Sequence, residues 1–226
     1  MARPLKREKS ITRKETLRAA AKLFHQKGYQ NTRVRDIAEE AGVSYNEVFR
    51  LFEDKDTILS EIVGIVLECQ FETAEEVLKD KNISKLYYYA FESVLQLYMA
   101  ETYDHIREMY VVSYSLPHSL NTVHKTLTIK LEEFFKDLLP ELETKDFYEL
   151  EIASAGIMRG YLSVPCNMYF NIDRKVKRFI ESNFKIYDVS KETISDVEEF
   201  LKQFDFKNIA INVLEKLKFY FEERVN

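Results

Sequence analysis

The side chains best suited to bind another molecule gather between residues 32 and 55, where the sequence is TRVRDIAEEAGVSYNEVFRLFEDK. Guanidinium groups form paired hydrogen bonds with guanine or phosphate, and a side-chain amide does so with adenine. The candidate groups of this kind in the segment are Arg33, Arg35, Asn46 and Arg50, and Lys55 adds an ammonium group that can bind a phosphate. Their types and close spacing favour contact with a polyanion such as a nucleic acid, if the chain presents them on one surface.

Two short helices must position these groups. Apolar residues at helical spacing predict a helix over residues 33–41, which Gly42 ends. Ser44 and Glu47 have the spacing of a capping box, so a second helix is predicted from there to about Leu51. Two helices joined by so tight a turn form a helix-turn-helix, and in proteins that use this motif the second helix lies in the DNA major groove.

The same pattern divides the segment into an inner and an outer face. The inner residues form a small core that fixes the angle between the helices, and they are Ile37, Ala38, Ala41, Val43, Val48 and Phe52. The residues left facing outward are Tyr45, Asn46, Glu47 and Arg50.

Composition and charge place this segment in a helical protein with a basic N-terminal part. The 226 residues include only five glycines and four prolines, and 46% are hydrophobic, which excludes a disordered chain and favours an all-α fold. Residues 1–55 carry 13 Lys or Arg against 8 Asp or Glu, whereas the remainder carries 20 against 30. This split is typical of a nucleic-acid contact confined to the first part, although a chance surface imbalance also produces it.

The remaining elements are also predicted to be helices. A capping-box pattern at residues 12–15 predicts a first helix over about residues 10–27, and a long apolar stripe from Lys55 to Leu78 predicts a linking helix of about seven turns. Further helices are predicted over residues 84–102, 103–114, 120–139, 145–169, 174–185 and 192–224. There is no glycine-rich phosphate loop, nucleophile elbow or metal-binding cluster, so we expect no enzyme activity, no cofactor and no metal site.

Residues 12–59 resemble the DNA-binding domain of the TetR family of bacterial transcriptional regulators. The matching residues are Ala20, Ala21, Leu23, Phe24, Gly28, Tyr29, Thr32, Ile37, Ala38, Ala41, Gly42, Val43, Ser44, Phe52 and Lys55. The resemblance implies a homodimer that binds a double-stranded DNA operator and is released by a small molecule bound in the helical body. It also implies a DNA-binding domain over residues 1–55 and a ligand-binding and dimerisation domain over residues 56–226.

The resemblance assigns DNA contacts residue by residue. It implies that Thr32 bonds a phosphate while capping its helix, that Arg35 reaches a base edge or phosphate, and that Lys55 meets a phosphate. The complete predicted DNA-binding set is Thr32, Arg33, Arg35, Ser44, Tyr45, Asn46, Glu47, Phe49, Arg50 and Lys55. Glu47 has two possible roles: it can accept a hydrogen bond from a cytosine amino group, or it can complete the capping box with Ser44, which we favour.

Three positions depart from the family pattern. Asn46 replaces the usual glycine, Phe49 replaces a phosphate-binding tyrosine, and Leu51 replaces a tyrosine or histidine. Two phosphate donors are therefore missing. We hypothesise that a basic arm before the first helix, formed by Arg3, Lys6, Arg7 and Lys9, partly compensates by following the DNA backbone or entering the minor groove.

The body offers candidates for a dimer interface and a ligand pocket. Small residues in the 145–169 helix and an apolar stripe in the last helix favour an interface of Ala153, Gly156, Gly160, Val213, Leu217 and Phe221, although the glycines can also serve packing within one subunit. Seven of the 14 tyrosines lie between residues 87 and 114, which favours a pocket for an apolar or aromatic effector. The candidate ligand residues are Tyr98, Tyr110, Tyr114 and Arg159. Arg159 can instead pair with Glu151, which we favour.

These observations lead to one main function and one alternative. We expect a ligand-responsive transcriptional regulator, most simply a repressor that binds a palindromic operator as a homodimer. The alternative is a helical adaptor that keeps the fold but reads DNA weakly or not at all. No export signal or membrane-spanning stretch is visible, and Cys69 and Cys166 lie far apart in apolar surroundings, so we expect a soluble cytoplasmic protein with free thiols and no membrane contact.

Overall fold

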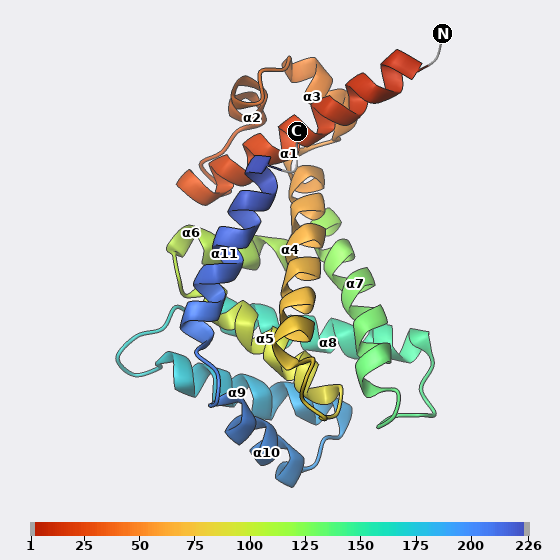
Figure 1. The fold of residues 1–226 in the computed structure, drawn as a ribbon, viewed down its shortest axis with the longest axis vertical. Helices are drawn as coiled ribbons and strands as arrows, with labels where there is room; N and C mark the ends of the chain where they lie inside the picture. The colour runs from red at the N-terminus through yellow and green to blue at the C-terminus, as the bar shows by residue number, and fades with distance from the viewer. Residues whose placement is uncertain (1–2, 224–226) are drawn as a thin grey trace.

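The protein is built from helices alone over the residues that the structure, a computed structural model, describes (Figure 1). It describes the backbone of residues 3–223 and the side chains of residues 11–221. The helices in this part of the chain are α1 (Arg3–Lys27), α2 (Val34–Glu40), α3 (Tyr45–Leu51), α4 (Lys55–Leu78), α5 (Leu86–Ala100), α6 (Asp104–Ser113), α7 (Pro117–Phe135), α8 (Thr144–Ser163), α9 (Ile172–Asn183), the short 3-10 helix η1 (Phe184–Tyr187), α10 (Lys191–Leu201) and α11 (Phe206–Glu223). The all-α fold predicted from the sequence is confirmed.

The first helix is longer than predicted. α1 begins at Arg3 rather than near Ser10, so the backbone of the proposed basic arm is helical. Pro4 is tolerated there because the first turn of a helix has no internal acceptor for its missing N–H. Thr12 lies inside the helix, where its carbonyl accepts a hydrogen bond from Thr16 Oγ1 at 2.8 Å, so the predicted cap at Thr12 is wrong. The side chains of the arm, Arg3, Lys6, Arg7 and Lys9, lie outside the described residues.

The helix-turn-helix forms as predicted. α2 and α3 are joined by a turn in which Gly42 has φ of +67°, a left-handed conformation that strains residues with a Cβ. Ile37, Val48 and Phe52 are buried between these helices and α1. The three helices α1–α3 are called the head below.

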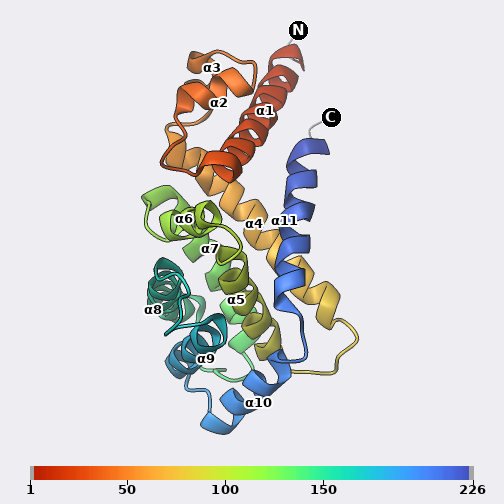
Figure 2. The ribbon, with the colours of Figure 1, turned by 90° about the vertical axis from the view of Figure 1, so that its left-hand side faces the viewer.

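α4 links the head to the other helices, which are called the body. Its N-cap is Asp54, whose side chain accepts a hydrogen bond from Thr57 N at 2.8 Å. α4 packs against α7 on one side and α5 on another, and α8 and α9 form a further layer behind α5 and α7 (Figures 1 and 2). Both cysteines are free, as predicted.

Two predicted helices of the body have different limits. α8 ends at Ser163 instead of Tyr169, because Pro165 cannot continue a helix. The segment predicted as one helix over residues 192–224 is two helices, α10 and α11. The Asp205 side chain accepts a hydrogen bond from Asn208 N at 3.1 Å and so starts a new helix there.

The last helix returns toward the head. α11 runs alongside α4 and packs against α5, α4 and α1 (Figure 2). Val213, Leu217 and Phe221 are buried on this inner side. The prediction that these three residues form a dimer interface is therefore wrong, because the apolar stripe of α11 finds its partner within the same chain.

Candidate nucleic-acid interface and junction cavity

The start of α3 is held by a complete capping box. Ser44 Oγ accepts a hydrogen bond from Glu47 N at 3.2 Å, and Glu47 Oε2 accepts from Ser44 N at 2.9 Å and from Ser44 Oγ at 2.7 Å. These bonds hold the pKa of the Glu47 carboxyl below its usual value. The capping role that we favoured for Glu47 is confirmed, and its charge is partly satisfied within the head.

α3 presents aromatic and polar side chains to solvent. Tyr45 and Phe49 are 44% and 57% exposed and stack with 6.1 Å between ring centroids. The Arg35 guanidinium from α2 lies 5.8 Å from the centroid of the Tyr45 ring. Asn46 and Arg50 are also exposed. α2 and α3 thus form one continuous outer surface that combines hydrogen-bond donors with exposed apolar rings.

Two predicted phosphate ligands lie behind this surface. Thr32 is fully buried and donates from Oγ1 to the Gly28 carbonyl at 2.7 Å, and the N-cap of α2 is the exposed Arg33 rather than Thr32. Lys55 Nζ donates to the carbonyls of Tyr29 and Thr32 at 2.7 and 2.8 Å. The predicted cap at Thr32 is wrong: its hydroxyl holds the loop after α1 together, and Lys55 ties that loop to the start of α4.

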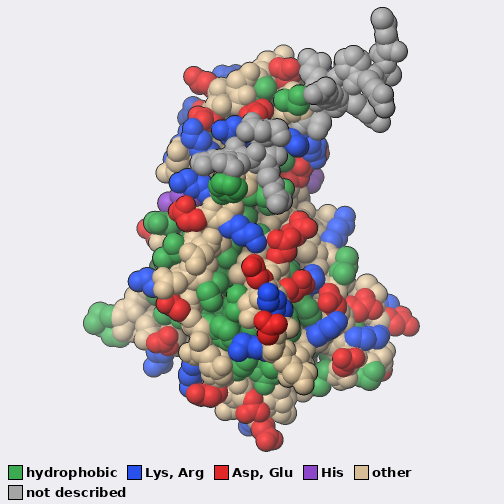
Figure 3. Space-filling model, in the orientation of Figure 1, with side chains coloured by type: hydrophobic (Ala, Val, Ile, Leu, Met, Phe, Trp, Pro, Cys, Tyr) green, Lys and Arg blue, Asp and Glu red, His purple; other side chains and the backbone are tan. Residues whose placement is uncertain are grey.

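The long face formed by α4 and α11 is not a phosphate-binding surface. Figure 3 shows Lys and Arg side chains interspersed with Asp and Glu along α4, and hydrophobic side chains gathered around the lower part of α11. Mixed charge of this kind gives no sustained positive potential.

Polar contacts join the head to the body. The Glu108 carboxylate on α6 accepts a hydrogen bond from Gln30 N at 2.7 Å, in the loop after α1. Asp56 at the start of α4 accepts hydrogen bonds from the backbone of His118 at 2.7 Å and Ser119 at 3.1 Å, the first amides of α7. A movement of α6 or α7 would therefore pull directly on the loop after α1 or on the start of α4.

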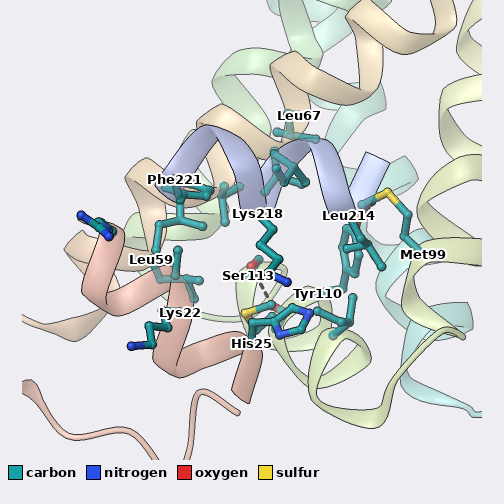
Figure 4. A pocket seen from close by; sticks show the side chains of 18 of the residues that line it. Lys22, His25, Leu59, Leu67, Met99, Tyr110, Ser113, Leu214, Lys218 and Phe221 are labelled. Carbon is teal, nitrogen blue, oxygen red and sulfur yellow. Dashed lines mark hydrogen bonds between the residues drawn. The ribbon is translucent and has the colours of Figure 1, made fainter. Parts of the chain in front are cut away.

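A cavity of about 490 Å³ lies at this junction between α1, α4, α5, α6 and α11 (Figure 4). We call it the junction cavity. Its apolar wall consists of Ala19, Ala21, Leu59, Ile62, Val63, Val66, Leu67, Met99, Ile106, Met109, Val123, Leu214, Leu217 and Phe221. Its volume falls within the range of about 300–1,000 Å³ that is typical of small-molecule sites.

One part of the junction cavity lining, called its floor, is polar but uncharged. Gln70 Nε2 donates to Tyr110 OH at 2.7 Å, and Tyr114 OH donates to Gln96 Oε1 at 2.9 Å. Gln96 Nε2 in turn donates at 2.6 Å to Glu92, whose burial raises its pKa to about 8 and keeps the carboxyl protonated at neutral pH. All these side chains are buried, so they form a fixed neutral floor.

Comparison with known proteins identifies the head. Residues 17–62 match the family model described as "Bacterial regulatory proteins, tetR family". This N-terminal part of the chain is therefore similar to regulators of the TetR family. The matched residues run from α1 into α4 and include the whole helix-turn-helix, which agrees with the resemblance found in the sequence.

Known regulators are similar to this chain over its N-terminal part. The HTH-type transcriptional regulator AcrR of Shigella flexneri is 40% identical over 62 residues, which are 27% of this chain and 29% of that protein. The HTH-type transcriptional repressor KstR2 of Rhodococcus jostii (strain RHA1) is 36% identical over 70 residues, or 31% of this chain and 34% of that protein. The chain therefore spans about a third of the length of these relatives.

Two solved structures align with most of the chain, at low sequence identity and with TM-scores below 0.5. A gamma-butyrolactone receptor (ArpA like protein) has 17% sequence identity and a TM-score of 0.46, and the match covers 87% of this chain and 98% of that one. Salmonella enterica GusR has 16% identity and a TM-score of 0.44, with 90% and 97% covered. At this level of similarity neither structure indicates a ligand or an operator for this chain. None of the described helices is both long enough and apolar enough to cross a membrane.

The predicted ligand residues divide into two groups. Tyr110 and Tyr114 line the junction cavity, whereas Tyr98 stacks on Phe206 at 5.4 Å between ring centroids and Arg159 lies on the surface of α8. Arg159 Nε donates to Ser115 Oγ at 2.8 Å. The predicted pair of Arg159 with Glu151 is wrong, because Glu151 is buried against His124 on α7.

The small residues of α8 remain on the surface. Ala153, Gly156 and Gly160 are exposed, and a Cβ built at either glycine would meet no atom within 4 Å. Ile152 and Tyr148 flank them and are also exposed. This part of α8 is therefore a free apolar face in the single chain.

Sequence reasoning missed several residues of the junction cavity, and only one of them carried a signal. Gln70 interrupts the apolar stripe of α4, and a polar residue within such a stripe indicates a buried hydrogen bond or a ligand contact. His25, Gln96 and Lys218 gave no comparable signal, because they reach the cavity from α1, α5 and α11 only after the chain has folded.

Proposed function

We propose that this protein is a ligand-responsive transcriptional regulator that acts in the cytoplasm as a repressor, binds a palindromic operator as a homodimer and is released by a small-molecule effector. The observation that carries the proposal is the capped, solvent-facing α3 within a TetR-family domain. The relative KstR2 is named a repressor, which supports the sign of regulation. We further propose that residues 1–55 act as the DNA-binding domain and residues 56–226 as the ligand-binding and dimerisation domain.

The DNA contacts that we propose differ in kind. Arg35 and Asn46 are exposed and suited to paired hydrogen bonds with guanine and adenine. Phe49 is exposed and cannot bond a phosphate, so we assign it an apolar contact with a thymine methyl group. Arg33 and Arg50 are exposed and suited to phosphates. Thr32 and Lys55 shape the head from behind and contribute indirectly.

Dimerisation is assigned to α8. Gly156 and Gly160 would allow a second α8 to approach closely, and the flanking Ile152 supplies apolar area that a partner would bury. α11 is not assigned to the interface, since its apolar stripe is buried in the same chain.

The junction cavity is the proposed effector site. Its walls include α1 of the head and α6 of the body, and Glu108 on α6 already holds the loop after α1 through Gln30 N. An effector that changes the distance between α1 and α6 would reorient the head relative to the body. Such a ligand shifts the protein between states only to the extent that it binds one of them more tightly.

A second candidate function is supported by the exposed aromatic pair. Tyr45 and Phe49 form an apolar patch on the outer surface of α3, and such pairs occur in protein interfaces as well as in DNA contacts. A helical adaptor that binds another protein through the head would use this patch without phosphate contacts.

One experiment separates the two functions. The purified protein is mixed with random DNA duplexes at moderate salt, and bound duplexes are enriched and sequenced. Recovery of an inverted repeat supports the dimeric regulator. Arg35→Ala should then weaken the affinity for that repeat about tenfold or more, whereas Arg178→Ala, on the exposed face of α9, should leave the affinity unchanged. If the protein retains duplexes without sequence preference, or retains none, the result contradicts the regulator and favours the adaptor.

A further inference from the structure

We propose that the junction cavity binds an amphipathic monoanion, in which a hydrocarbon body lies along α4 and α11 and a single carboxylate lies at Lys218. This inference rests on the proposed function and deepens it by naming the chemical class of the effector. It follows from the apolar wall, the charges at the mouth of the cavity and the neutral floor.

The wall requires a largely hydrocarbon ligand. Leu59, Ile62 and Val66 line the cavity from α4, and Leu214 and Phe221 line it from α11. A ligand of drug or lipid size that fills such a space gains free energy mainly from the apolar area that it removes from water. A strongly polar ligand such as a sugar would leave its hydroxyl groups without partners along this wall.

The mouth of the cavity leaves one positive charge without a partner. Lys22 forms an ion pair with Glu40, and Arg18 lies 3.9 Å from Glu15, so these four charges are matched within the head. Lys218 has no ion-pair partner among the described residues. Figure 4 shows that its side chain points from α11 into the cavity, on the side of His25 and Tyr110.

A single unmatched ammonium group fits a head group of one negative charge. The cavity lining includes three Lys or Arg side chains and two Glu side chains, so a second negative charge on the ligand would find no unmatched cation there. A carboxylate meets this condition, because it carries one charge and accepts charge-assisted hydrogen bonds from an ammonium group.

The floor of the cavity does not attract a charged group of either sign. Gln70, Gln96, Tyr110 and Tyr114 are neutral and largely bonded to one another or to Glu92. Gln70 Oε1 is buried and has no hydrogen-bond partner among the described residues. A hydroxyl group at the far end of the ligand could satisfy this acceptor, whereas a second charge there would be costly to bury. The charged end of the ligand therefore belongs at Lys218.

Isothermal titration calorimetry of the full chain without DNA tests the proposal. Dodecanoate is compared with dodecanol and dodecyltrimethylammonium, which have the same hydrocarbon chain but a neutral or a cationic head. The variants are Lys218→Met, which removes the charge, and Lys218→Arg, which keeps it. Lys216→Met is the matched control, because Lys216 lies on the same helix, pairs with Glu72 at 3.7 Å and does not line the cavity.

We expect dodecanoate to bind most tightly of the three ligands. Lys218→Met should weaken the binding of dodecanoate about threefold to tenfold, which is the range expected for an exposed to partly desolvated ion pair. The same substitution should leave the affinity for dodecanol unchanged. Lys218→Arg and Lys216→Met should retain the parent affinity for dodecanoate. Four outcomes would each overturn the proposal. They are equal binding of all three ligands, tighter binding of the cation, no binding of any ligand, and an affinity for dodecanoate that does not depend on Lys218.

The two proposals fail independently. The calorimetry measures ligand binding without DNA, whereas the selection from random duplexes measures DNA binding without ligand. A protein that selects an inverted repeat but does not bind dodecanoate keeps the proposed function and loses the ligand class. A protein that binds dodecanoate through Lys218 but selects no DNA sequence loses the regulatory function and keeps the anion site.

Discussion

Replacing Glu92 by glutamine should change how the stability of the protein depends on pH. The Glu92 side chain is fully buried beneath Gln96, which lines the junction cavity. Its Oε1 accepts a hydrogen bond from Gln96 Nε2 at 2.6 Å, while Oε2 has no partner among the described residues. Burial disfavours the carboxylate and raises the pKa of Glu92 from 4.5 to about 8. At neutral pH the group is therefore protonated in the folded protein and ionised in the unfolded chain.

The sign and size of the effect follow from this difference in bound protons. Between pH 4.5 and about 8 the folded protein holds one proton that the unfolded chain has released. The free energy of unfolding therefore decreases by about 1.4 kcal/mol for each pH unit in this window, a total of the order of 5 kcal/mol. Glutamine has nearly the same shape and does not titrate. The stability of Glu92→Gln relative to the parent should thus increase with pH by the same slope.

Urea unfolding followed by circular dichroism at several pH values between about 5 and 8 measures this slope. Glu141→Gln is the matched control, since Glu141 is exposed and its replacement removes the same charge without removing a buried carboxyl. The free energy of unfolding of the control should show the same pH dependence as that of the parent protein. If the stability of Glu92→Gln shows the same pH dependence as the parent, Glu92 is ionised in the folded protein and the argument from burial is wrong.

Three further substitutions test the head and the proposed dimer. Gly28→Ala should lower the free energy of unfolding by about 1–2 kcal/mol or more, because Gly28 has φ of +84° and an added Cβ would collide with the Glu108 carboxylate. An unchanged melting temperature would contradict the left-handed backbone conformation at Gly28. Ser44→Ala should cost about 1 kcal/mol and speed hydrogen exchange at the amide of Glu47, so unchanged exchange would exclude the cap. Gly156→Glu should yield monomers in sedimentation velocity, and a persistent dimer would move the interface away from α8.

The helix-turn-helix could be predicted from the sequence because its signals are local. The capping box of Ser44 and Glu47, the break at Gly42 and the apolar spacing of Ile37 and Val48 each act within a few residues, and the structure contains all of them. The cap of α2 was predicted at the wrong residue. Thr32 can serve as a cap in isolation, but its hydroxyl bonds the Gly28 carbonyl instead.

The candidate site could be predicted only in part. Tyr110 and Tyr114 were predicted as ligand residues and line the junction cavity, whereas Tyr98 and Arg159 are absent from its described lining. A cluster of tyrosines indicates a concave apolar environment but does not say which of them share one cavity. Lys218 lies more than 100 positions from Tyr110 in the sequence, and only the fold brings them to one space.

The sequence by itself determined the all-α class, the helix-turn-helix of the head and the residues on its outer surface. The tertiary structure alone decided the path of α11 and the roles of Thr32 and Lys55. The physical reason is that an amphipathic pattern specifies that a helix face must be buried but not against which partner. In α11 the partner is the chain's own α4, α5 and α1, so the stripe predicted as a dimer interface closes the junction cavity instead.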